Sequence, residues 1–182
     1  MIGAVMPLAA HGQTVGRHPT LDSARSAEMC REIQQWFART DSLFQAAARS
    51  ASMSTLRAYA DSTFVSTPGL VVKGSSGFTF YSKSELLRLV TRGGQAPDPL
   101  FTLTPAGTSV GLLSSARAMY VRRYIEHDAE YVARGRIRPY VAMEAGTLVR
   151  QGREWRLLER VNATGSTGPI DSTTTGHSWE CR

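Results

Sequence analysis

Apolar side chains recur every three or four positions between residues 22 and 49, which is the period of one face of an α-helix. Wound at helical pitch, these positions fill an arc of roughly 120°. Asp22 or Ser23 can accept hydrogen bonds from the first turn. The pattern predicts a long helix, ending at about Arg49, that lays one face on a core. The arc holds Met29, Ile33, Trp36, Phe37, Thr40, Leu43, Phe44 and Ala47.

Shorter elements are predicted over the next forty or so residues. Ser82 and Glu85 have the spacing of a capping box, in which each side chain bonds the backbone N–H of the other residue. Apolar and aromatic runs separated by glycine and serine indicate a hairpin just before this box. The expected elements are helices at about 53–60 and 82–90 and strands at 70–72 and 78–81.

From Leu100 onward the pattern changes to a period of two, which is typical of strands with one face buried. Helices followed by a run of antiparallel strands indicate an α+β fold. The expected strands are 100–104, 108–113, 116–126, 137–149 and 154–162.

The alternation predicts a sheet with one apolar face and one aromatic and charged face. In the last strand it places Trp155 and Leu157 opposite Arg160. The aromatic and charged face is expected to be either the wall of a half-polar pocket or a subunit interface, since Tyr and Arg are common at both. Along 116–126 the apolar face carries Met119, Val121 and Ile125, and the other face carries Tyr120, Arg122, Tyr124 and Glu126.

A chain of 182 residues with 42% hydrophobic residues suits one globular domain. We expect a lead-in at 1–21, a folded domain at 22–163 and a Ser/Thr/Gly-rich tail at 164–182. The net charge of +6 comes from scattered arginines rather than from a block of like charges. We therefore expect no nucleic-acid partner. No apolar run is long enough for a transmembrane segment.

Cys30 and Cys181 are the two cysteines, and neither belongs to a metal-binding motif. They are either free thiols or a disulfide that ties the end of the chain to the first helix. An apolar run at 1–10 precedes Ala10-His11-Gly12, whose small residues suit a signal-peptidase site. This favours a periplasmic or secreted protein over a cytoplasmic one, and an oxidising compartment would favour the disulfide.

Three segments resemble the nuclear transport factor 2-like superfamily, which includes ketosteroid isomerases and SnoaL-like polyketide cyclases. They are the Tyr-Ala-Asp phrase and turn within 56–69, the capped helix at 81–90 and the Gly-x-x-Trp sequence at 152–155. The resemblance covers roughly residues 25–163. It implies a cone-shaped roll, in which a curved, mostly antiparallel sheet wraps around about three N-terminal helices and forms a pocket.

The isomerase residues of that superfamily are not reproduced here. Where the resemblance places a general-base aspartate, immediately before Pro68, this chain has Thr67, which cannot act as a base. A second family acid would fall at or beside Glu144, and the predicted first helix contains no tyrosine to match the family's donor. His127 and Asp128 are weak alternatives, because neighbours in a strand point to opposite faces.

The sequence thus favours a non-catalytic domain that binds a small apolar or amphipathic ligand, with no cofactor and no metal. A SnoaL-like enzyme using Glu144 as acid–base, assisted by His127 or Asp128, is the alternative. A dimeric structural or assembly module is a second alternative, because relatives commonly form homodimers through the sheet face. The expected pocket residues are Trp36, Tyr59, Thr67, Tyr120, Arg122, Tyr124, Arg138, Tyr140 and Glu144.

Overall fold

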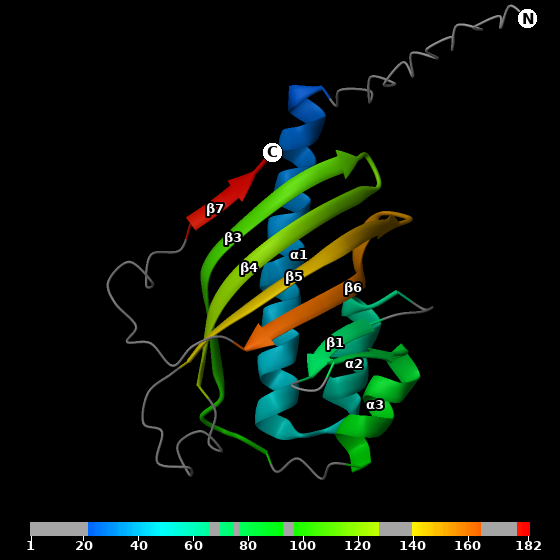
Figure 1. Cartoon of the computed structure of the whole chain (residues 1–182), viewed down its shortest axis with the longest axis vertical. Helices are drawn as coiled ribbons and strands as arrows, with labels where there is room; N and C mark the ends of the chain where they lie inside the picture. The colour runs from blue at the N-terminus through cyan, green and yellow to red at the C-terminus, as the bar shows by residue number, and fades with distance from the viewer. Residues whose placement is uncertain (1–21, 66–69, 75–76, 93–96, 128–139, 165–177) are drawn as a thin grey trace, which may run out of the picture.

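A long N-terminal helix lies across one face of a curved sheet (Figure 1). The computed structural model describes residues 22–65, 70–74, 77–92, 97–127, 140–164 and 178–182. Its helices are α1 (Ser23–Ser50), α2 (Met53–Thr63) and α3 (Lys83–Arg92). Its strands are β1 (Leu70–Gly74), β2 (Gly77–Tyr81), β3 (Thr102–Ser114), β4 (Arg117–His127), β5 (Tyr140–Gln151), β6 (Glu154–Thr164) and β7 (Ser178–Cys181).

The ends of α1 are set by local hydrogen bonds. The Asp22 side chain accepts a bond from the Arg25 backbone N–H at 3.0 Å, which caps the first turn. Ala51 ends the helix in the left-handed region, with φ at 46°, and its N–H donates to the Ala47 carbonyl. The predicted helix and its apolar arc are confirmed, since the buried residues of α1 are Met29, Ile33, Trp36, Phe37, Thr40 and Ala47.

The predicted capping box of α3 is also confirmed. The Glu85 N–H donates to the Ser82 hydroxyl at 3.2 Å, and the Ser82 N–H donates to the Glu85 carboxylate at 2.7 Å. Hydrogen bonds from the Ser82 backbone and hydroxyl lower the pKa of Glu85 below its ordinary value. The ionised form of Glu85 therefore stabilises the first turn of this helix.

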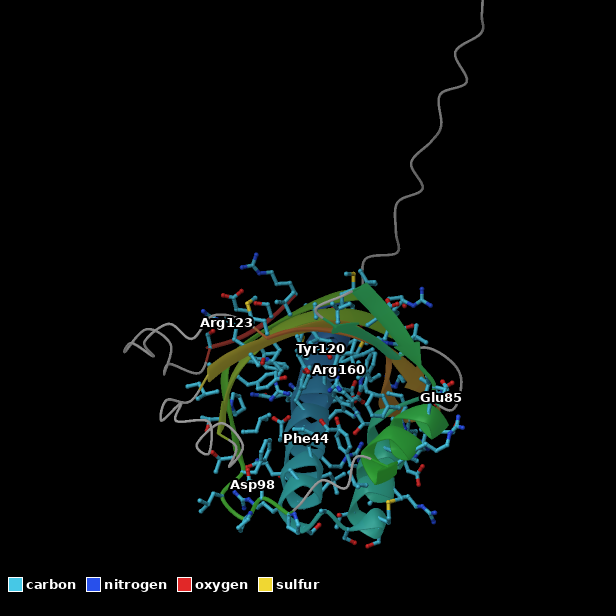
Figure 2. All side chains as sticks on the ribbon, turned by 60° about the horizontal axis from the view of Figure 1, so that its bottom comes forward. Phe44, Glu85, Asp98, Tyr120, Arg123 and Arg160 are labelled. Atoms are coloured by element: carbon cyan, nitrogen blue, oxygen red, sulfur yellow. A yellow bond between two sulfur atoms is a disulfide. The ribbon has the colours of Figure 1, made fainter. Side chains whose placement is uncertain are left out.

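In the described part of the chain, five strands form the curved sheet in the order β6-β5-β4-β3-β7. All neighbours are antiparallel except β7, which pairs with β3 in parallel. The hairpin β1–β2 is a separate sheet and lies beside β6 (Figure 1). Figure 2 shows the sheet arching over the helices. The expected α+β architecture with a curved, mostly antiparallel sheet is confirmed.

One strand boundary predicted from the sequence is wrong. The segments 100–104 and 108–113 are not separate strands but parts of β3, which pairs with β4 along its whole length. A register shift between Pro105 and Gly107 absorbs the irregularity, and pairing resumes at once on its far side. The turn-forming residues of this stretch thus form a bulge rather than a loop.

The placing of Trp155 and Leu157 opposite Arg160 is also wrong. β6 shifts register against β5, so that Leu148 pairs with Leu157 while Thr147 pairs with Glu159. The extra residue, Leu158, reverses the alternation that follows it. As a result Arg160 lies on the inner face of the sheet, the same face as Trp155 and Leu157, and Val161 lies on the outer face.

The aromatic and charged face of the sheet is the inner one. Tyr120 and Arg122 keep only 3% and 4% of their surfaces exposed and pack toward α1. Met119 and Val121, on the outer face, keep 53% and 49% exposed. The interior therefore holds Tyr120 and Arg122 of β4, while Met119 and Val121 of the same strand face outward.

The end of the chain returns to the first helix. Within the range expected to be a tail, β7 joins the sheet edge, and Cys181 forms a disulfide with Cys30 of α1, with 5.9 Å between the two Cα atoms. Of the alternatives left open by the sequence, the structure therefore has the disulfide. In the described residues no helix is long and apolar enough to cross a membrane.

Candidate functional site

A cavity of about 140 Å³ lies between α1, α2 and the inner face of the sheet. This is close to the ~150 Å³ of an engineered protein cavity that binds benzene, and it is smaller than the clefts of roughly 300–1,000 Å³ that hold drug-sized ligands. The cavity thus has room for a single ring rather than a fused ring system. Its walls comprise Trp36, Phe37, Thr40, Asp41, Phe44, Tyr59, Thr63, Leu103, Tyr120, Arg122, Tyr124, Ala142, Met143, Glu144, Leu157 and Arg160.

The helix side of the cavity follows from the spacing along α1. Phe37, Asp41 and Phe44 lie three or four positions apart, so they share one face of the helix. Trp36 and Thr40 lie beside them, and the Thr40 hydroxyl donates to the Trp36 carbonyl at 3.0 Å. This bond gives the buried Thr40 hydroxyl a hydrogen-bond acceptor within the helix itself.

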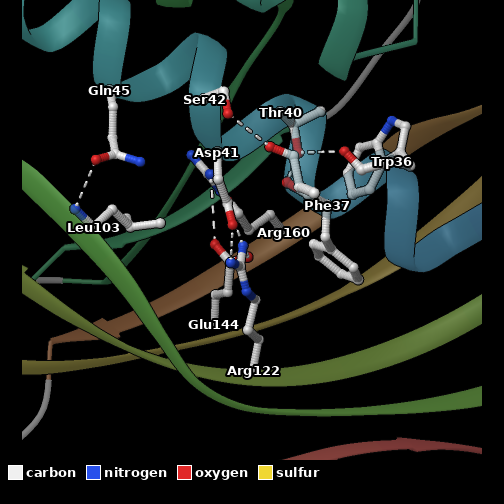
Figure 3. Close-up of polar contacts among 11 residues, drawn as sticks. Trp36, Phe37, Thr40, Asp41, Ser42, Gln45, Leu103, Arg122, Glu144 and Arg160 are labelled. Atoms are coloured by element: carbon white, nitrogen blue, oxygen red, sulfur yellow. Dashed lines mark hydrogen bonds and ion pairs between the residues drawn. The ribbon is translucent and has the colours of Figure 1, made fainter. Parts of the chain in front are cut away.

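Two arginines and two carboxylates meet at this cavity (Figure 3). Arg122 holds Asp41 through both terminal guanidinium nitrogens, one of them at 2.8 Å. Arg122 also lies 3.7 Å from Glu144, and Arg160 lies 3.6 Å from the other Glu144 oxygen. The Arg122 and Glu144 side chains are only 5% and 7% exposed. Each charge in this cluster is therefore balanced by an opposite charge within the interior.

Aromatic rings support both guanidinium groups. The Arg122 guanidinium carbon lies 4.8 Å from the centre of the Phe37 ring, and that of Arg160 lies 5.7 Å from the centre of Phe64. Burial by itself would lower the pKa of Arg122, but the hydrogen bond and charge of Asp41 outweigh it and raise the pKa. Both arginines consequently stay positively charged.

Two buried tyrosines bring hydroxyl groups to the same cavity. Burial raises the pKa of Tyr59, and it raises the pKa of Tyr120 further, with the nearby Glu144 carboxylate adding to the effect. Both phenols are therefore protonated at neutral pH and can donate hydrogen bonds. Figure 2 shows Tyr120 and Arg160 beneath the arch of the sheet.

Several polar atoms in the cavity wall have no hydrogen-bond partner among the described residues. They are Trp36 Nε1, Thr63 Oγ1, Arg122 Nε and Arg160 Nε. An unpaired buried polar group is costly, so such groups are rare in protein interiors. Their concentration around one cavity indicates a site built for something other than packing alone.

The structure brings together most of the residues that the sequence predicts for a pocket. Thr67, Arg138 and the weak catalytic candidate Asp128 lie outside the described residues. His127 and Tyr140 fall at strand ends, where the side chains are not described. Those that line the cavity are Trp36, Tyr59, Tyr120, Arg122, Tyr124 and Glu144.

Sequence reasoning missed two charged members of the site, Asp41 and Arg160. Asp41 follows Thr40 of the apolar arc, but no sequence signal pairs it with Arg122, which lies 81 positions away. Arg160 was placed on the aromatic and charged face, which is the inner one, but it was not named as a pocket residue. Phe37 and Phe44 were predicted to be core residues, and their place on the arc is the signal that could have added them to the pocket.

The charged groups of this site are paired with one another rather than arranged around a metal. In the ranges that the structure describes, no group of three His, Cys, Asp or Glu side chains could hold a metal ion. The Glu144 carboxylate, expected from the resemblance as a possible acid–base group, has a guanidinium beside each oxygen. This arrangement places a positive charge within 3.7 Å of each Glu144 oxygen.

No family model matches this sequence, and no curated protein matches it. Solved structures do match it. A nuclear transport factor 2-like protein with a cystatin-like fold from Novosphingobium aromaticivorans superposes with a TM-score of 0.58 at 17% identity, over 80% of this chain and 87% of that one. The chain has the nuclear transport factor 2-like fold.

Two further structures agree with this nuclear transport factor 2-like fold. A candidate scytalone dehydratase from the same organism gives a TM-score of 0.57 at 12% identity and covers 80% of this chain and 89% of its own. A nuclear transport factor 2-like protein of unknown function from Pseudomonas aeruginosa gives 0.53 at 17% identity, over 75% and 97% of the two chains. At these identities the likeness establishes the fold.

The outer face of the sheet has a second hollow, of about 510 Å³. It lies where Gly111 and Ala145 carry small side chains or none, next to the exposed Met119 and Val121. Met143 also borders the inner cavity, but it lies two residues from Ala145 on β5 and so has the register of the outer face, where 41% of its surface is exposed. Glu159, Glu180 and Arg182 also border this hollow, which we call the outer hollow.

Proposed function

We propose that this protein is a non-catalytic nuclear transport factor 2-like domain that binds one small apolar or amphipathic molecule in its inner cavity. The observation that carries the proposal is a 140 Å³ space walled by aromatic rings and by charges already paired with each other. The rings supply contact area, and the few polar groups orient the ligand. The volume restricts the ligand to about the size of one ring.

We propose a non-catalytic role because the acidic groups of the cavity are already paired with arginines. Glu144 is held between Arg122 and Arg160, and Asp41 is held by Arg122. A general base must reach a substrate proton with a free oxygen. The alternative is a SnoaL-like enzyme in which Glu144 is the acid–base group; it would require a ligand to displace one guanidinium from this carboxylate.

Binding is tested with acetophenone and cumene, two single-ring compounds with the same number of non-hydrogen atoms, by ligand-observed NMR on the whole chain. We expect at least one of them to bind. Ala142→Leu adds three carbons to the cavity wall and should weaken binding by about tenfold or more, while leaving the protein folded.

Ala145→Leu is the matched control. It makes the same change on the same strand but on the outer face, so binding should be unchanged. If neither compound binds, or if both variants bind as the wild type does, the proposed ligand site is wrong. A turnover of either compound, abolished by Glu144→Gln, would favour the enzyme.

We also propose that two copies pair through the outer face of the sheet. The exposed Met119, Val121 and Met143 form an apolar strip there, which is unusual for a surface that stays in water. Light scattering coupled to gel filtration should report a dimer, and Val121→Glu should convert it to a monomer. Leu100→Glu changes an apolar residue that is 73% exposed elsewhere and should leave the dimer intact. A monomeric wild type would rule out this interface.

Export to the periplasm or outside the cell is the location that we propose. The Cys30–Cys181 disulfide supports it, because disulfides persist mainly in oxidising compartments. Fractionation of cells expressing the full chain should recover the protein outside the cytoplasm with the disulfide formed. Recovery from the cytoplasm with two free thiols would argue against export.

A further inference from the structure

Besides the Thr63 hydroxyl, two phenol protons in the inner cavity lack an acceptor among the described residues. The Tyr59 hydroxyl accepts a hydrogen bond from Arg160 at 3.5 Å, which leaves its own proton free to be donated. The Tyr120 hydroxyl has no hydrogen-bond partner among the described residues. Both residues line the cavity, and they are only 9% and 3% exposed. A phenol O–H that borders a cavity and has no protein acceptor can donate to a ligand or to water there.

The charges of the cavity point to a neutral ligand. Two guanidinium groups and two carboxylates are already paired at distances of 3.7 Å or less. An anionic ligand would have to compete with Asp41 or Glu144 for an arginine, and a cationic ligand would have to displace an arginine. A neutral ligand would leave these pairs in place and avoid the cost of an unpaired buried charge.

From these two observations we infer that Tyr59 and Tyr120 select a neutral single-ring compound that carries a hydrogen-bond-accepting oxygen, such as a carbonyl. This inference rests on the proposed ligand-binding function and adds the class of ligand and the residues that recognise it. The aromatic residues Trp36, Phe37 and Phe44 contact the ring, and the phenol groups donate to the oxygen.

The arginines support this recognition indirectly. By donating to Tyr59, Arg160 polarises that hydroxyl and strengthens it as a donor. Burial and the Glu144 charge raise the pKa of Tyr120, so its proton remains available up to strongly alkaline pH. The ion cluster thus supports the Tyr59 and Tyr120 hydroxyls as hydrogen-bond donors and does not itself contact the ligand.

The test compares three compounds of equal size on the full-length, unreduced protein: acetophenone, cumene and benzoate. Acetophenone has a neutral acceptor, cumene has none, and benzoate carries a negative charge. A neutral hydrogen bond contributes about 1 kcal/mol, so acetophenone should bind about fivefold more tightly than cumene. Benzoate should bind more weakly than acetophenone. Affinities are measured by ligand-observed NMR titration.

Tyr120→Phe and Tyr59→Phe remove one hydroxyl each and keep the ring. Because the Tyr120 hydroxyl has no acceptor, Tyr120→Phe should fold normally, with an unchanged or higher melting temperature. In each variant the preference for acetophenone over cumene should fall about threefold or more. Ser42→Ala removes an exposed hydroxyl next to Asp41 and should leave the preference unchanged.

The outcomes separate this inference from the proposed function. Three outcomes would overturn the assignment of ligand class but not the proposed ligand site. They are equal affinities for acetophenone and cumene, tighter binding of benzoate than of acetophenone, and an unchanged preference in both Phe variants. No binding of any of the three compounds would overturn both proposals.

Discussion

Arg122 is the residue on which the interior charges converge. Its guanidinium bonds Asp41 with both terminal nitrogens, approaches Glu144 and stacks against Phe37. Removing such a group from water costs several kcal/mol, which the pairing offsets only while every partner is present. The stability of the interior should therefore depend steeply on the acidic partners of Arg122.

Asp41→Asn tests this dependence, because it removes one negative charge and little volume. We expect it to lower the free energy of unfolding by about 3 kcal/mol, since it leaves the buried Arg122 short of a counter-charge. Asp61→Asn is the matched control: Asp61 pairs with Lys83 but is 67% exposed, and surface pairs contribute only about 0–1 kcal/mol. Urea unfolding followed by circular dichroism measures both; equal effects would contradict the role given to the cluster.

At the level of elements, alternation along a strand predicted part of the site. Tyr120, Arg122 and Tyr124 were placed on one face from the sequence alone, and they do share the inner face. The prediction was possible because β4 has no bulge between these residues, so the period of two holds. The apolar face of α1 could also be predicted from the sequence, because α1 is one continuous α-helix of 28 residues and the helical period holds along it.

Strand β6 shows where such reasoning stops. Whether Arg160 shares a face with Trp155 and Leu157 depends on one extra residue, Leu158, and a bulge of this kind has no distinctive residue type. Asp41 shows a second limit, because its role depends on which strand lies opposite α1. Contacts between distant elements follow from the fold, and a single sequence does not contain them as a pattern.

Gly146 of β5 is the glycine on which the packing of β5 against its neighbours depends most. It pairs with Tyr120 on one side and Arg160 on the other, and the Tyr120 ring lies over it. A Cβ here would stand 2.4 Å from the Glu159 carbonyl oxygen and 2.8 Å from the Tyr120 ring. The first of these is backbone, so it cannot simply rotate away.

Gly146→Ala should therefore lower the free energy of unfolding by about 1–3 kcal/mol, the range for overpacking. Gly111→Ala is the matched control on β3, because a Cβ there meets nothing within 4 Å. It should leave stability unchanged or raise it slightly, since alanine restricts the unfolded chain. Thermal unfolding of both variants gives the comparison, and a Gly146→Ala protein as stable as Gly111→Ala would show that β5 and β6 can move apart.

At the level of the whole molecule, the two ends of the described chain are joined through β7. The Arg182 N–H donates to the Val110 carbonyl at 3.0 Å, and the Leu112 N–H donates to Arg182 at 2.6 Å. Trp179 packs on Phe37, with 6.3 Å between the ring centres. Four residues of parallel strand are little on their own, so the covalent link to α1 should be the main restraint on β7.

Replacing both cysteines with serine tests that restraint. The disulfide spans 151 positions, and the chain-entropy treatment gives about 5 kcal/mol of stabilisation for a loop of that size. Measured disulfides commonly contribute less than this treatment gives. We expect a loss of about 3–5 kcal/mol by urea unfolding, together with faster hydrogen exchange at Leu112, whose amide is bonded to Arg182.

Reduced wild-type protein is the control, because it breaks the same bond without changing a residue. It should unfold at the same urea concentration as the double variant, and both should exchange the Leu112 amide equally fast. If β7 stays protected in both, the hydrogen bonds and Trp179 hold it without the disulfide. In that case the end of the sheet is a packed strand in its own right, and the bond to α1 reinforces an arrangement that the side chains already specify.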